Sequence, residues 1–178
     1  MAETWQLNAR EIAPGDGKSM LGILNGAGSG KVIRVYRMWM LNNFTGVAYT
    51  GALLNLEIRA ITGLTVGSGA AVTPVKHDTA NAALDANVVM FTGGTVSGES
   101  ATLIRLLGWS QNEPVVADTS LYTAQVLIPL GVIWDTGYGS TVLQPLTLRE
   151  GEGVHIKCTT NATVGTMDIR MEFTQSSS

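Results

Sequence analysis

The chain has 178 residues, of which 45% are hydrophobic and only 14% are charged, against about 25% charged residues in a typical globular domain. Its net charge is −3, and its 11 Lys and Arg residues form no basic run, which argues against binding to a nucleic-acid backbone. The single cysteine, Cys158, excludes an internal disulfide, and no apolar stretch reaches the roughly 18 residues that a membrane-spanning helix needs.

Residues 1–18 precede the first regular strand pattern that we recognise. We therefore predict an extended N-terminal arm, residues 1–18, followed by a single β-sandwich domain, residues 19–178. A domain of this size can bury roughly 70% of the surface that its unfolded chain exposes. The first residues lack the basic and apolar regions of a secretory signal, which predicts synthesis in a cytoplasm.

The segment NGAGSGKV, from Asn25 to Val32, has the look of a phosphate-binding loop but departs from that pattern twice. Asn25 stands where the pattern has its first Gly, and Val32 stands where it has Ser or Thr. The residues that follow are rich in β-branched and aromatic types, which predicts a strand rather than the helix that would face a phosphate. We interpret the segment as a Gly/Ser turn between two strands.

Alternation of apolar and polar residues predicts most of the remaining elements as strands. It is clearest in residues 52–61, where Asn55, Glu57 and Arg59 share the polar face, and in residues 166–173. Further strands are predicted at 19–24, 31–41, 88–91, 101–107, 121–130, 132–134, 146–148 and 154–158. Residues 79–86 are rich in Ala but form at most one or two helical turns. The sequence thus predicts an all-β fold, an antiparallel β-sandwich that is jelly-roll-like.

The predicted strand at 31–41 is apolar on both faces. Ile33, Val35 and Trp39 lie on one side of a regular strand, and Met38 and Met40 lie on the other. Such a strand is either sandwiched between two layers or covered by a partner chain. The sequence leaves both alternatives open.

Two histidines are the first candidates for chemistry. His77 and Asp78 could join a serine in a hydrolase triad, but no sequence pattern brings a nucleophile to them. The plainer interpretation is that Asp78 caps the Ala-rich turn that follows it. His155 alternates outward on its strand, which predicts a side chain facing solvent or an interface.

Metal ligands are too few to form a site. His155 and Cys158 fall on opposite faces of a strand, whereas a zinc site needs three or four converging ligands. Glu150 and Glu152 flank Gly151 and either bind Ca²⁺ or are simply solvated. We therefore predict no catalytic residue, no metal and no cofactor.

The aromatic residues suggest contact sites. Trp5 lies in the predicted arm, and Trp109 lies beside a turn. Either side chain could stack on a sugar or anchor in a neighbouring subunit. Packing in the core is the commoner role of a tryptophan. We name Trp5, Leu7 and Trp109 as the candidate residues of a subunit or capsid interface.

Five segments together resemble small virion structural proteins of tailed bacteriophages, of the capsid decoration or cement type. They are GSGKVIRVYRMWMLNN (28–43), LEIRAIT (56–62), TPVKHDTANAAL (73–84), PLGVIWDTGYG (129–139) and PLTLREGEGVHIKC (145–158). The resemblance implies a jelly-roll or related sandwich that self-associates, often as a trimer, and binds the major capsid protein on the outside of the virion. It implies no enzymatic activity and no catalytic residues.

Two functions follow as expectations. The first is a capsid decoration protein that binds across capsomer boundaries and stabilises the icosahedral shell, in which case deletion of the arm is expected to weaken attachment without unfolding the protein. The alternative is a host-receptor or carbohydrate-binding module of a tail or head fibre, because exposed loops on β-sandwiches carry such sites readily.

Overall fold

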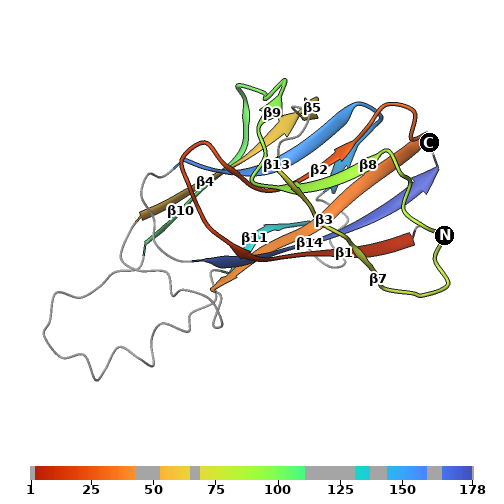
Figure 1. Cartoon of the computed structure of the whole chain (residues 1–178), viewed down its shortest axis with the longest axis horizontal. Helices are drawn as coiled ribbons and strands as arrows, with labels where there is room; N and C mark the ends of the chain where they lie inside the picture. Colours follow the sequence, from red (N-terminus) through yellow and green to blue (C-terminus); the bar gives the residue numbers. More distant parts are fainter. Residues whose placement is uncertain are drawn as a thin grey trace, which may run out of the picture.

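The computed structural model describes residues 3–42, 53–64, 69–110, 131–136, 144–159 and 166–177. In these ranges the chain forms strands, turns and loops and no helix, arranged as two six-stranded sheets that face each other and one short two-stranded sheet (Figure 1). All the strand pairs are antiparallel. The predicted all-β antiparallel sandwich is confirmed.

We name the two large sheets A and B. Sheet A has the order β11-β3-β14-β1-β7, with β12 also paired to β3, and consists of β1 (Glu3–Ile12), β3 (Lys31–Asn42), β7 (Val75–Lys76), β11 (Gly131–Asp135), β12 (Leu146–Leu148) and β14 (Met167–Ser177). Sheet B has the order β10-β4-β13-β2-β8-β6 and consists of β2 (Ser19–Asn25), β4 (Leu53–Ile61), β6 (Ala70–Ala71), β8 (Val88–Thr92), β10 (Leu103–Ser110) and β13 (Glu152–Cys158). The small sheet pairs β5 (Gly63–Leu64) with β9 (Val96–Ser97).

The described strands pair in a nested order. The first long strand, β1, pairs with the last, β14, and β2 pairs with the strand before it, β13. Inside these pairs, β3 joins β11 and β12, and β4 joins β10. Nested antiparallel pairs that divide between two facing sheets are the arrangement expected of a jelly-roll-like sandwich.

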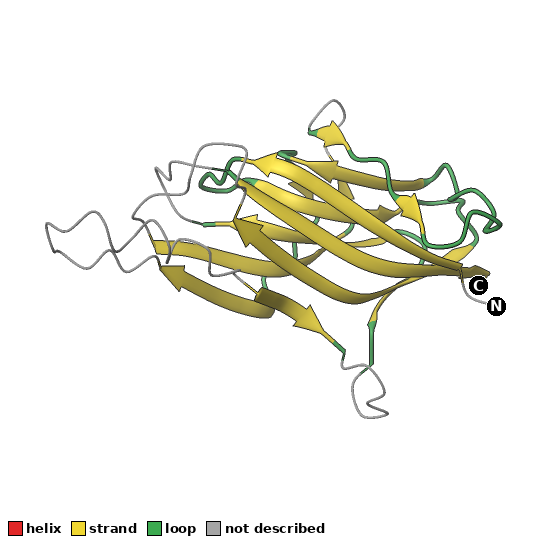
Figure 2. Ribbon diagram, turned by 90° about the horizontal axis from the view of Figure 1, so that it is seen from below, coloured by secondary structure: helices red, strands yellow, loops and turns green. Residues whose placement is uncertain are grey.

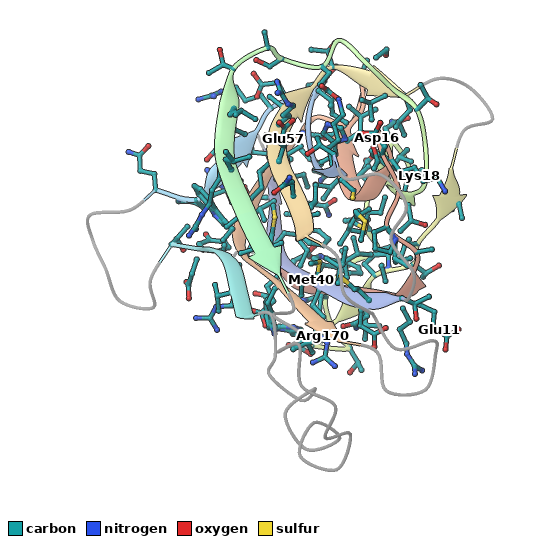
Figure 3. All side chains as sticks on the ribbon, turned by 90° about the vertical axis from the view of Figure 1, so that its left-hand side faces the viewer. Glu11, Asp16, Lys18, Met40, Glu57 and Arg170 are labelled. Carbon is teal, nitrogen blue, oxygen red and sulfur yellow. The ribbon has the colours of Figure 1, made fainter. Side chains whose placement is uncertain are left out.

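The core lies between the sheets. Each long strand turns one face inward, so that buried apolar side chains of β1, β3 and β14 meet those of β2, β4, β8 and β13 in one cluster. Figure 3 shows Met40 between Arg170 on the outside of sheet A and Glu57 on the outside of sheet B. The outer faces of the two sheets are therefore where polar side chains gather and where a ligand or partner can bind.

The separate N-terminal arm is wrong. Residues 3–12 form β1, which pairs with β14 on one side and β7 on the other. Trp5, Leu7 and Ala9 point into the core, in an alternation that the sequence does contain. A break in register between Ala9 and Ile12, with Glu11 at a φ of +58°, interrupts the pattern and hides it. The sandwich thus begins at β1.

A bulge explains why the strand at 31–41 is apolar on both faces. The register of β3 against β14 shifts at Tyr36, which lies between the pairs Val35↔Phe173 and Arg37↔Glu172. Ile33 and Val35 therefore point inward before the bulge, and Met38 and Met40 point inward after it. The outward face keeps Trp39, which is only partly buried. Neither a second covering layer nor a partner chain is needed to account for the pattern.

Most other predicted strands are present, with shifted ends. The last one continues to Ser177, and the one predicted at 101–107 runs from Leu103 to Ser110. Residues 79–86 form turns and no helix. Asp78 acts there as expected, since its carboxylate accepts the N–H of Ala80 at 2.9 Å. The predicted strand at 121–130 lies outside the described residues.

Candidate functional site

A network of charged side chains lies on the outer face of sheet B. Glu99 is its centre: Oε1 accepts from Nζ of Lys157 at 2.8 Å and lies 3.6 Å from Nε of Arg59. Oε2 lies 3.2 Å from Nε2 of His155. Arg59 also pairs with Glu57 at 2.6 Å and donates to the carbonyl of Ser100 at 2.8 Å. The network thus fixes the segment around Glu99 over β4 and β13.

His155 points outward from the core, as the alternation predicts, but it is buried in this network and does not face solvent. It lies beside Gly22 on β2, and Nδ1 is 2.7 Å from Oγ of Ser19. Nε2 lies 3.2 Å from the Glu99 carboxylate without the geometry of a hydrogen bond. Burial lowers the pKa of His155 to about 4, against the nearby Glu99 charge, which acts to raise it. The imidazole is therefore neutral at pH 7.

The residues Ser19, His155 and Glu99 have the types of a hydrolase triad, but they do not form a working one. Ser19 is 1% exposed and His155 is fully buried, so no substrate carbonyl can reach the Ser19 hydroxyl in this structure. Moving the covering segment aside would also remove Glu99, the group that would orient the histidine. We interpret the trio as a hydrogen-bonded and electrostatic tie between β2, β13 and the segment around Glu99.

The predicted interface residues separate into two groups. Trp5 and Leu7 are 3% and 0% exposed, and both belong to the core. Their assignment to an interface is wrong, because a partner cannot reach them in the folded chain. Trp109 lies on β10, where its backbone pairs with Leu54. Its side chain lies outside the described part of the structure.

The strand β10 carries an exposed apolar surface. It is the last described strand at one edge of sheet B, paired with β4. Leu103 and Ile104 are each 37% exposed and Leu106 is 62% exposed. We call these three side chains the β10 edge patch. An unpaired edge strand with exposed apolar side chains is a common site of association with another chain.

The outer face of sheet A has a different character. The bulge at Tyr36 turns both Tyr36 and Arg37 away from the core, and Trp39 follows on the same face. The guanidinium of Arg37 lies over the Trp39 ring at 5.6 Å from its centroid and pairs with Asp135 at 3.0 Å. Across β14, Arg170 is the direct neighbour of Trp39. Alternation alone places Arg37 and Trp39 on one side of the strand, but only the bulge brings Tyr36 to that face, and only the strand pairing brings Arg170 beside Trp39.

The phosphate-loop-like turn is occupied by the protein itself. The N–H of Gly28 donates to the Glu150 carboxylate at 2.5 Å, and Asn25 binds the carbonyls of Lys31 and Leu148 at 2.8 and 3.1 Å. Ser29 donates to Asn25 at 2.6 Å. A carboxylate at the turn repels a phosphate, so the interpretation as a connecting turn is confirmed.

The other sequence candidates stay apart. Cys158 packs in the core while His155 lies on the opposite face of β13, as expected. Among the described residues, no three or more His, Cys, Asp or Glu side chains are placed to hold a metal ion. Within the same ranges, no helix has the length and hydropathy needed to cross a membrane.

Comparisons with protein families, with curated proteins and with solved structures found no match to the chain.

Proposed function

We propose that the protein is a non-enzymatic virion structural protein that decorates a bacteriophage capsid. The observation that carries the proposal is the β10 edge patch. Within the described residues the outer edge of β10 has no strand partner, so it offers backbone groups for strand addition and apolar side chains for burial, the two contributions by which one protein adds to the edge of another. Full burial of a Leu or Ile side chain contributes about 1.5–3 kcal/mol. Because part of each of these three side chains is already covered in the folded chain, burying the rest contributes roughly 2–4 kcal/mol in total, which is one part of the docking energy.

The surface charge supports attachment to a dense protein lattice. With 14% charged residues and a net charge of −3, neighbouring copies repel each other weakly. The resemblance to decoration proteins adds the expected partner, the major capsid protein, and a homotrimer as the favoured assembly. In this proposal each copy bridges two capsomers on the capsid exterior, so that its binding energy stabilises the closed shell.

Co-sedimentation with emptied, expanded capsids of the encoding virus tests the proposal. The purified full-length chain is mixed with capsids at increasing concentration, and the pellet is measured by gel densitometry. Saturable binding at a fixed ratio to the capsid protein is expected. Protein that remains in the supernatant at all ratios, while folded by circular dichroism, would overturn the proposal.

A further inference from the structure

The outer face of sheet A presents a flat array of side chains from three adjacent strands. The register places Asn8 of β1, Arg170 of β14 and Trp39 of β3 in one row. The next row along the strands contains Glu172 and Arg37. Neighbouring strands are about 4.8 Å apart and same-face residues along a strand about 7 Å apart, so the two rows span the size of a small oligosaccharide. Figure 2, seen from below, has these long strands in front.

An aromatic ring stands among these polar groups. Trp39 is partly buried, and Arg37 holds the ring by its contact at 5.6 Å while pairing with Asp135. Tyr36, three residues earlier on β3, is 36% exposed. A ring fixed in this way loses little entropy on binding, and the apolar C–H face of a sugar can pack on it.

Within these two rows the free charges balance. Arg37 is paired with Asp135, whereas no ion pair or hydrogen bond within the described residues engages the side chains of Arg170 and Glu172. The Asn8 Oδ1 atom accepts from Gln6 at 2.8 Å, which leaves its amide N–H₂ as a donor. These two rows therefore offer one free guanidinium, one free carboxylate and one amide, a neutral set of donors and acceptors. One row further along, the Arg34 guanidinium donates to the Ser176 hydroxyl at 2.8 Å.

We infer that this face binds a neutral saccharide, with Trp39 as the stacking ring and Asn8, Arg170 and Glu172 as the hydroxyl ligands. Adjacent sugar hydroxyls can each accept and donate hydrogen bonds. A guanidinium next to a carboxylate satisfies both needs, because the guanidinium donates and the carboxylate accepts. A nucleic acid requires net positive charge, which the balanced pair does not supply. The core of a protein interface is depleted of charged residues, whereas these two rows carry Arg37, Arg170 and Glu172. The inference is independent of the proposed capsid role.

Affinity electrophoresis tests it directly. The full-length protein runs in native gels that contain a soluble neutral glucan, mannan or galactan, with an acidic polygalacturonate gel for comparison. Retardation by at least one neutral polysaccharide is expected. The Trp39→Ala and Arg170→Ala variants should each bind about tenfold more weakly, equivalent to about 1.4 kcal/mol. Leu106→Ser, on the β10 edge patch, is the matched control and should be retarded like the wild type.

Several outcomes would overturn the inference. They are no retardation in any neutral gel, retardation only by polygalacturonate, or unchanged retardation of both Trp39→Ala and Arg170→Ala. Thermal melting confirms that each variant is folded, and Arg170→Ala decides the question if Trp39→Ala unfolds. Loss of capsid binding by Trp39→Ala, with no sugar binding by the wild type, would assign the face to a protein partner instead.

Discussion

Acidification should destabilise the fold through His155, and the size of the effect follows from its burial. The pKa of His155 is lowered to about 4 in the folded protein, whereas an unfolded histidine titrates near pH 6.5. Its contribution to stability is therefore complete above about pH 6.5 and is lost as the pH falls toward 4, because only the unfolded chain takes up the proton. Between about pH 7.5 and about pH 5, the expected loss is about 2 kcal/mol.

Urea denaturation at these two pH values measures the effect. The His155→Gln variant, which has no imidazole there, should lose about 2 kcal/mol less than the wild type on acidification, whatever its absolute stability. His77→Gln is the matched control, since His77 is exposed, and it should behave like the wild type. Burial acts to raise the pKa of Glu99, but the hydrogen bond and charge of Lys157, together with the charges of His155 and Arg59, lower it overall. Its effect falls below about pH 4.5 and outside the chosen interval. An identical pH dependence in His155→Gln and wild type would refute the buried neutral histidine.

Two further predictions test the packing. A Cβ on Gly22 would overlap the Phe91 ring, with Cε1 only 2.6 Å away, so Gly22→Ala should lower the free energy of unfolding by about 1–3 kcal/mol. Adding Phe91→Leu to the Gly22→Ala variant should recover part of that loss. If the effects of the two substitutions on the free energy of unfolding are simply additive, the contact between Gly22 and Phe91 is contradicted. Deletion of residues 1–12 should prevent folding, because β1 is a strand of sheet A. Trp5→Ala should lower the free energy of unfolding by about 3–5 kcal/mol, because the Trp5 side chain is buried in the core. A truncated chain that melts at the wild-type temperature would restore the arm interpretation.

The alternation of side chains was enough to predict the sandwich, because most strands bury one face and expose the other. Alternation gives the wrong inward face where an extra residue shifts the register of a strand. The irregularity near Glu11 concealed β1 and so placed Trp5 and Leu7 at an interface instead of in the core. The bulge at Tyr36 made β3 appear apolar on both sides. Both failures come from single extra residues, whose effect on register is set by the partner strand.

The candidate sites were less accessible from the sequence than the fold. Trp109 was chosen for its type, and the structure places its backbone on the strand that carries the β10 edge patch. The sequence places Trp39 only on a strand, because Asn8 and Arg170, which complete its row, are distant in the chain and join it only through the pairing of β1, β14 and β3. The outward direction of His155 follows from the alternation, but its burial does not, because Glu99, the residue above it, belongs to a loop whose position no periodicity predicts.

The most direct test of the capsid proposal is co-sedimentation of Leu106→Ser with expanded capsids, beside wild type and Val75→Ser. Val75 is 58% exposed, close to the 62% of Leu106, but lies on β7, at the edge of the other sheet. Leu106→Ser should bind the capsid at least about tenfold more weakly, and Val75→Ser should bind like the wild type. Equal binding of all three proteins would contradict attachment through the β10 edge patch.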